Sequence, residues 1–175
     1  MRITLELEPV DIERFLGVLA RSHRLALEAD EADVIAAAKQ ALDCLPIGSA
    51  PAYVRKRIGV VQRLIIMLED DAWALPVPER TRLLESLVYF SDPEDLIPDD
   101  IEVIGLLDDA IVLELLLRRQ RHVLQAYVDF CNYRATLGAE ASTPEMHHAD
   151  ALKLAQRREA LIARMRRRGE RAAAA

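Results

Sequence analysis

Eight carboxylate side chains fall within residues 89–111, together with two prolines and one glycine. They are Asp92, Glu94, Asp95, Asp99, Asp100, Glu102, Asp108 and Asp109. Clustered carboxylate oxygens are the ligands that Ca²⁺ and Mg²⁺ prefer, so this stretch could hold a divalent cation. The candidate ligands are Asp95, Asp99, Asp108 and Asp109. The spacing is not that of an EF-hand loop, which has acidic residues at alternate positions and a glutamate at the end. A metal-binding protein, or a metal-dependent enzyme, is therefore one hypothesis.

Most of these carboxylates also have structural explanations. Asp92 precedes a proline, which disfavours the helical backbone and favours a turn. Asp108 and Asp109 fall in the first turn of a predicted helix, where carboxylates complement the positive end of the helix dipole. Asp109 differs from the others because Leu113 and Leu116 follow it at helical spacing. It is therefore expected at the head of an apolar stripe, where a carboxylate needs a hydrogen bond or a cationic partner.

Other reactive side chains do not form a recognisable catalytic arrangement. The sequence has no serine in a nucleophile elbow and no glycine-rich phosphate loop. Cys44 and Cys131 are far apart in the sequence, and we expect two buried thiols in a reducing compartment. We predict no catalytic residue and no cofactor. A non-enzymatic protein is favoured, and the metal hypothesis leaves the question of an enzyme open.

The charges are distributed unevenly along the chain. Residues 151–175 contain one lysine and seven arginines against two glutamates, a formal charge of +6, whereas the whole chain carries −6. The first 150 residues therefore carry −12. The candidate basic interaction surface consists of Arg164, Arg166, Arg167 and Arg168. The same predicted helix has a narrow apolar side made of Leu161, Ile162 and Met165.

Three interpretations of this basic helix are open. It could be a solvated end helix that docks through its apolar side, or it could bind anionic lipid at a membrane surface or nucleic acid. It could also bind the acidic stretch 89–111 of the same chain or of a neighbour, because arginine forks match carboxylates. The −12 charge of the remaining chain would repel polyanions. We therefore expect no nucleic acid partner, and we favour a protein partner over a membrane surface.

Composition predicts an all-α fold. The chain has 175 residues, enough for one domain with a core, and 51% of them are hydrophobic. Only six glycines and 5% aromatic residues are present, which favours helix over sheet. No apolar run reaches the roughly 18 residues that a membrane span needs. The acidic, alternating N-terminus is not a secretory signal, so a cytoplasmic location is expected.

Apolar spacing and capping residues predict a single-domain bundle of about six helices. The expected ranges are about 9–27, 34–45, 52–69, 79–90, 106–135 and 144–168, of which 106–135 is the longest. Residues 2–8 alternate in polarity and predict a short extended segment that could pair with its copy in a second subunit. Trp73 is expected to anchor the loop 70–78 to the core. We expect an acidic helical domain over residues 1–150 and a basic helix over 151–175 that docks on it.

The stretch Tyr-Phe-x-x-Pro-x-Asp-Leu-Ile-Pro-Asp, followed by a glycine and Leu-Leu-Asp-Asp-Ala, resembles the YkvA-like family of small bacterial domains of unknown function. The matching residues are Tyr89, Phe90, Pro93, Asp95, Leu96, Ile97, Pro98, Asp99, Gly105, Asp108, Asp109 and Ala110. Residues 70–76 and 126–134 and the arginine-rich end resemble a longer proteobacterial form. Glu102 stands where relatives usually have a proline, which removes a rigid element and adds a charge. The resemblance implies a helical domain whose signature is this acidic turn, and it implies no established reaction.

Together these patterns favour a helical interaction or scaffold module that is non-enzymatic and associates with itself. The protein partner is not identified by the sequence, and a homo-oligomer is one expectation. The alternatives are a divalent-metal protein that uses the acidic stretch, and peripheral membrane association through the arginine-rich helix.

Overall fold

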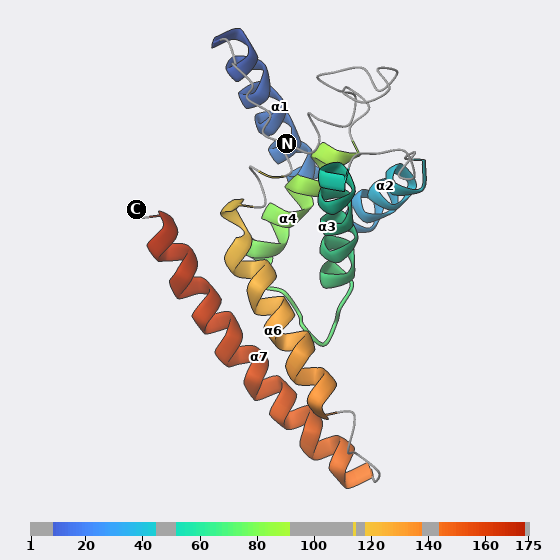
Figure 1. Ribbon diagram of the computed structural model, residues 1–175, viewed down its shortest axis with the longest axis vertical. Helices are drawn as coiled ribbons and strands as arrows, with labels where there is room; N and C mark the ends of the chain where they lie inside the picture. The colour runs from blue at the N-terminus through green and yellow to red at the C-terminus, as the bar shows by residue number, and fades with distance from the viewer. Residues whose placement is uncertain (1–8, 45–51, 92–113, 115–117, 138–143, 174–175) are drawn as a thin grey trace. The chain divides into compact units, whose positions relative to one another are not determined.

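The computed structural model describes residues 9–44, 52–91, 114, 118–137 and 144–173, and these residues form an all-α protein (Figure 1). Its helices are α1 (Pro9–Glu28), α2 (Glu31–Cys44), α3 (Ala52–Leu68), α4 (Val77–Phe90), α6 (Arg121–Leu137) and α7 (Pro144–Ala173). No strand occurs among the described residues. The all-α prediction is therefore confirmed. The extended segment predicted at residues 2–8 lies outside the described ranges.

The helices belong to two compact units. The first contains α1, α2, α3 as far as Ile65, and α4. The second contains residues 66–76, α6 and α7. The predicted domain division between residues 150 and 151 falls inside α7, which is helical on both sides of it. That division stays a prediction.

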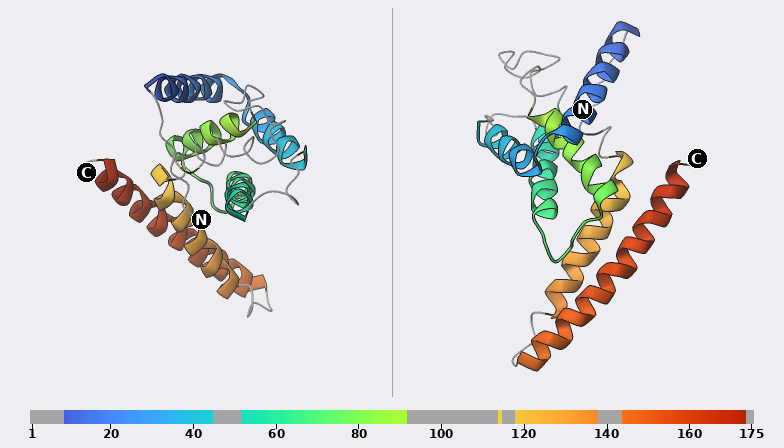
Figure 2. Two further views of the ribbon diagram at one scale, coloured as in Figure 1. Left: turned by 45° about the horizontal axis from the view of Figure 1, so that its top comes forward. Right: turned by 180° about the vertical axis from the view of Figure 1, so that it is seen from behind.

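In the first unit, α4 packs against α1 and α2 (Figure 2). The apolar residues of α2 that are buried, Val34, Ile35, Ala38 and Leu42, follow helical spacing along one face. Two polar pairs join these helices. Arg80 of α4 binds Glu31 of α2, and His23 Nδ1 of α1 lies 2.7 Å from Glu85 Oε1 of α4. Asp30 caps the start of α2, since its Oδ1 accepts a hydrogen bond of 2.8 Å from the Ala32 amide.

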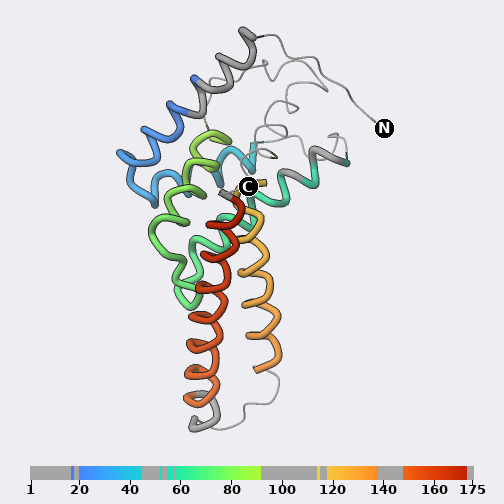
Figure 3. The backbone as a smooth tube through the Cα atoms, turned by 90° about the vertical axis from the view of Figure 1, so that its left-hand side faces the viewer, coloured from blue at the N-terminus to red at the C-terminus, as the bar shows by residue number. Residues whose placement is uncertain are grey.

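In the second unit, α6 and α7 lie side by side and run in opposite directions (Figure 3). Three cross-contacts establish the register. They are His122 with Gly169, Asp129 with Arg164, and Tyr133 with Arg157. As the residue number rises along α6, its partner on α7 falls, which is the pattern of an antiparallel helix pair.

The apolar contacts of this pair follow helical spacing. On α6, Val123, Ala126, Tyr127 and Phe130 are buried at positions i, i+3, i+4 and i+7. On α7, Leu161 is 2% exposed and Met165 is 1% exposed, whereas Ile162 is half-buried. The apolar side predicted for the basic helix is therefore confirmed.

Two expectations about local structure are wrong. The helix predicted over 106–135 does not continue through Gln120, which forms a turn, and α7 is the longest helix in the described part of the chain. No proline or glycine marks that turn, so apolar periodicity alone could not locate it. The two cysteines are free thiols, as expected, but Cys44 is exposed and Cys131 is half-buried. Cys44 is the last residue of α2 and lies off the buried face of that helix.

Candidate functional site

Arginines from two distant parts of the chain line one open groove in the second unit. The groove has a volume of about 560 Å³. Its lining residues are Arg118, Arg119, Arg121, His122, Gln125, Arg168 and Ala172. We call this feature the arginine groove. The described part of its lining contains four arginines and no acidic residue, and these arginines give the groove positive charge.

The turn at Gln120 arranges one side of the arginine groove. Its carbonyl oxygen accepts hydrogen bonds from the amides of Val123 (2.9 Å) and Leu124 (3.1 Å), which starts α6 immediately after the turn. Gln120 itself is buried, whereas Arg119 and Arg121 on either side of it are exposed. The turn therefore buries the Gln120 side chain and exposes the arginines on either side of it.

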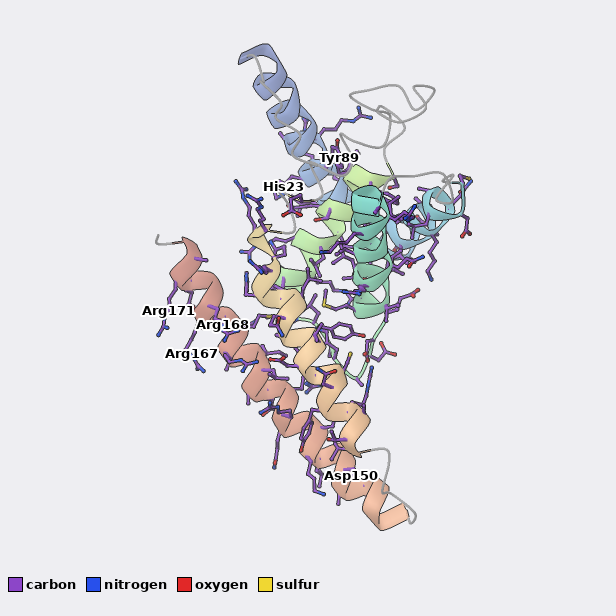
Figure 4. All side chains as sticks on the ribbon, in the orientation of Figure 1. His23, Tyr89, Asp150, Arg167, Arg168 and Arg171 are labelled. Carbon is purple, nitrogen blue, oxygen red and sulfur yellow. The ribbon has the colours of Figure 1, made fainter. Side chains whose placement is uncertain are left out.

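The last turns of α7 form the other side. The imidazole of His122 lies against the α7 backbone at Gly169, where an added Cβ would come within 2.9 Å of Nε2. Because residue 169 has no side chain, the His122 ring can occupy this place, and a Cβ there would make the ring shift. The contact brings Arg168, the preceding residue of α7, to the groove that Arg121 and His122 line from α6. Figure 4 shows Arg167, Arg168 and Arg171 close to one another near the C-terminal end of α7.

A nearby carboxylate is already paired. Asp129, one turn after Gln125 on α6, accepts a hydrogen bond of 3.0 Å from Gln125 Nε2 and forms an ion pair with Arg164 of α7. The hydrogen bond from Gln125 and the contact with Arg164 hold the pKa of Asp129 below its ordinary value, although partial burial opposes them. The charge of Asp129 is therefore committed to the helix pair, and it does not line the arginine groove.

The chemistry of the arginine groove is that of anion binding. A guanidinium group offers a planar fork of N–H donors that matches a carboxylate or a phosphate. Among the described residues of the lining, none carries a hydroxyl, a thiol or a carboxylate. These residues are suited to the recognition of an anionic group.

The structure separates the four arginines of the predicted basic surface. Arg168 lines the arginine groove, and Arg164 is paired with Asp129. Arg166 and Arg167 are exposed on α7 and are not among the lining residues. Sequence reasoning missed the arginines at 118, 119 and 121, although the run Arg-Arg-Gln-Arg was a visible signal.

The acidic signature lies outside the described residues. This holds for Asp95, Asp99, Asp108 and Asp109, so the proposed metal ligands stay a prediction. Among the residues that the structure does describe, no group of three or more His, Cys, Asp or Glu side chains is placed to hold a metal ion. Within the same residues, no helix is both long enough and apolar enough to cross a membrane.

A second polar cluster, which sequence reasoning also missed, is centred on Asp70. Its Oδ2 accepts hydrogen bonds from the Tyr127 hydroxyl (2.9 Å) and from Arg134 Nη1 (2.8 Å). Its Oδ1 accepts the amides of Ala72 (3.1 Å) and Trp73 (3.2 Å). Burial and the hydrogen bond with Asp70 raise the pKa of the Tyr127 phenol well above its ordinary value. These contacts tie the loop after α3 to α6.

Trp73 completes this attachment. It is fully buried, and its ring centroid lies 5.0 Å from that of Phe130 and 5.8 Å from that of Tyr127. These are favourable distances for aromatic pairs. The prediction that Trp73 anchors its loop to the core is confirmed. The Asp70 cluster is therefore structural, because its polar atoms bind one another within the second unit.

The comparison with known protein families concerns a different part of the chain. Residues 80–115 match the family described as a protein of unknown function (DUF1232). The match begins in α4 and extends over the acidic stretch, and it ends before Arg118. No curated protein and no solved structure matches the chain. The arginine groove consequently lies outside the matched residues.

Proposed function

We propose that this protein is a non-enzymatic interaction module that binds acidic segments of a protein partner in the arginine groove. The observation that carries the proposal is that Arg168 of α7 lines the same groove as Arg118, Arg119 and Arg121, in a chain whose net charge is −6. Guanidinium groups gathered in one place attract an acidic ligand.

The shape of the groove supports a polypeptide ligand. The groove is open and is walled by arginine side chains, whose aliphatic stems offer apolar surface and whose ends offer charge. An extended acidic segment can pack its apolar atoms on the stems and pair its carboxylates with the guanidinium groups. Each exposed ion pair contributes only about 0.2 to 1 kcal/mol, so several carboxylates must engage together.

Long polyanions are a poorer fit. The first 150 residues carry −12, so an extended nucleic acid would meet repulsion beyond the groove, whereas a short acidic segment would not. A membrane surface is disfavoured for another reason. Peripheral helices insert an apolar face into lipid, and Leu161 and Met165 of α7 are already buried in the protein.

Three finer predictions from the sequence belong to this proposal. They are self-association, a cytoplasmic location, and the likeness of residues 89–111 to the YkvA-like family. The match of residues 80–115 to a family of unknown function is compatible with an interaction module and assigns no activity.

The test uses fluorescence anisotropy with a labelled peptide of alternating glutamate and alanine. A glutamine–alanine peptide is the uncharged counterpart. We expect the acidic peptide to bind, with an affinity that falls as salt screens the charges. The double variant Arg121→Gln/Arg168→Gln should bind roughly tenfold more weakly, because two exposed pairs together contribute about 1.4 kcal/mol. Both arginines are exposed, so the fold should tolerate the change.

The matched control is Arg24→Gln/Arg167→Gln. It removes the same amount of charge from exposed positions, and Arg167 is the immediate neighbour of Arg168 without lining the groove. Its affinity should stay within about twofold of the unmodified protein. Equal losses in the two double variants, or no binding of the acidic peptide at low salt, would refute the groove as the binding site.

A further inference from the structure

We infer that the partner is a second copy of this chain, whose acidic stretch 89–111 docks in the arginine groove of the first. This inference rests on the proposed function and names the ligand of the same site. The sequence predicted self-association through residues 2–8, or through a basic helix that binds the acidic stretch of a neighbour. The arginine groove is a more specific binding surface, and of its four arginines only Arg168 belonged to the predicted basic surface.

Charge complementarity favours this occupant. The acidic stretch has eight carboxylates within 23 residues, and the groove is lined by four arginines and one histidine. Among the lining residues that the structure describes none is acidic, and these residues therefore favour a carboxylate-rich segment. Apolar residues also alternate with the carboxylates of the stretch, and the arginine stems and Ala172 offer them apolar contact.

The arrangement predicts a head-to-tail assembly. Each chain has one acidic stretch and one arginine groove, and the two are different surfaces. Contacts between unlike surfaces are heterologous, so they build rings or open chains instead of stopping at a symmetric dimer. Each added copy again offers its own groove and its own acidic stretch to further copies.

The experiment is a mixing test read by multi-angle light scattering. The groove variant is Arg121→Gln/Arg168→Gln, and the segment variant is Asp95→Asn/Asp99→Asn. The unmodified protein should form species larger than a monomer at low salt and dissociate as salt is raised. Each variant alone should be monomeric at the same concentration. Their equimolar mixture should form a one-to-one dimer, because only one intact groove and one intact segment remain.

The control Arg24→Gln/Arg167→Gln should associate like the unmodified protein. Circular dichroism and thermal melting of each variant show whether it is folded. A second measurement needs no variant: a synthetic peptide of residues 89–111 should dissociate the unmodified assembly at least tenfold more effectively than a scrambled peptide of equal charge.

Three outcomes would overturn the inference. One is a monomeric unmodified protein at every concentration and salt. Another is a mixture of folded variants that stays monomeric, which would point to docking within one chain. The last is equal effect of the native and scrambled peptides. If the alternating glutamate peptide still binds through Arg121 and Arg168 in any of these cases, only the identity of the partner fails. If the alternating glutamate peptide does not bind, the proposed function itself is refuted.

Discussion

The imidazole of His122 and the backbone at Gly169 are in contact, and a Cβ at residue 169 would lie within 2.9 Å of His122 Nε2. His122 stands near the start of α6, and Gly169 stands near the end of α7. Their contact therefore joins two segments that are 47 positions apart in the sequence. It lies beside the arginine groove, since Arg121 and Arg168, which line the groove, are the sequence neighbours of His122 and Gly169.

Gly169→Ala tests this contact. The new methyl group should push the His122 ring aside and change the groove, so the acidic peptide should bind severalfold more weakly. Stability should change little, because the gain of about 1 kcal/mol in helix propensity offsets the displaced ring. Gly59→Ala is the control, as nothing lies within 4 Å of its added Cβ. It should raise the free energy of unfolding in urea by about 0.5 to 1 kcal/mol and leave binding unchanged. Unchanged binding in Gly169→Ala would contradict a role for the His122 contact.

Asp70→Ala should be strongly destabilising. The change removes a carboxylate that accepts hydrogen bonds from Tyr127, from Arg134 and from two backbone amides. The Asp70 side chain is only 10% exposed. Loss of a shared, largely buried acceptor should lower the free energy of unfolding by about 2 to 4 kcal/mol, measured by urea denaturation. The neighbouring Asp71 is exposed, so Asp71→Ala should change it by less than about 0.5 kcal/mol. Similar losses for the two variants would show that the Asp70 contacts contribute little.

Tyr127→Phe should alter stability at alkaline pH. Burial and the hydrogen bond with Asp70 raise the pKa of Tyr127 above its ordinary value of 10.0, so the fold favours the neutral phenol. That stabilisation is complete below pH 10 and is lost as the pH rises above it. The unmodified protein should therefore be about 1 kcal/mol more stable than Tyr127→Phe near neutral pH. The difference should shrink above pH 10 in chemical denaturation experiments. A constant difference up to pH 11 would exclude the linkage.

Asp129→Asn should alter the dependence of stability on pH in the opposite direction, with its effect lost at acidic pH. The hydrogen bond from Gln125, assisted by Arg164, lowers the pKa of Asp129 from its ordinary value of 3.8. The stabilisation is therefore complete above pH 3.8 and is lost as the pH falls below it, through the folded-state pKa. Near neutral pH the variant should be less stable by about 0.5 to 1 kcal/mol, since both partners are partly exposed. The two proteins should converge below pH 3.8. Asp71→Asn, at an exposed position, is the control and should stay within about 0.5 kcal/mol of the unmodified protein near neutral pH.

Local features of the fold were predictable because neighbouring residues determine them. Asp30 caps α2 with its own side chain, and Pro144 begins α7 as a proline at a first helical position does. Leu161 and Met165 are one helical turn apart, which was enough to predict that they share a buried face. Trp73 is large and apolar in a loop, so its burial followed from the cost of exposing it.

Other features depended on contacts between distant residues and were missed. Asp70 gains its role from Tyr127 and Arg134, which are 57 and 64 positions away. The turn at Gln120 is buried by its surroundings and has no glycine or proline to mark it. Arg118, Arg119 and Arg121 form a groove only together with the end of α7, which is distant from them in the sequence.

By itself, the sequence determined that the chain is helical and that its acidic and basic residues are segregated, because helical periodicity and formal charge are properties of the residues and their order. Only the tertiary structure decided which arginines act together. Arg164 and Arg168 are one turn apart on α7, and the sequence gives no reason to distinguish them. In the structure, Arg164 forms an ion pair with Asp129, whereas Arg168 lines the arginine groove. The antiparallel register of α6 and α7 causes this difference, because it places Arg164 beside Asp129 and brings the end of α7, with Arg168, to the start of α6.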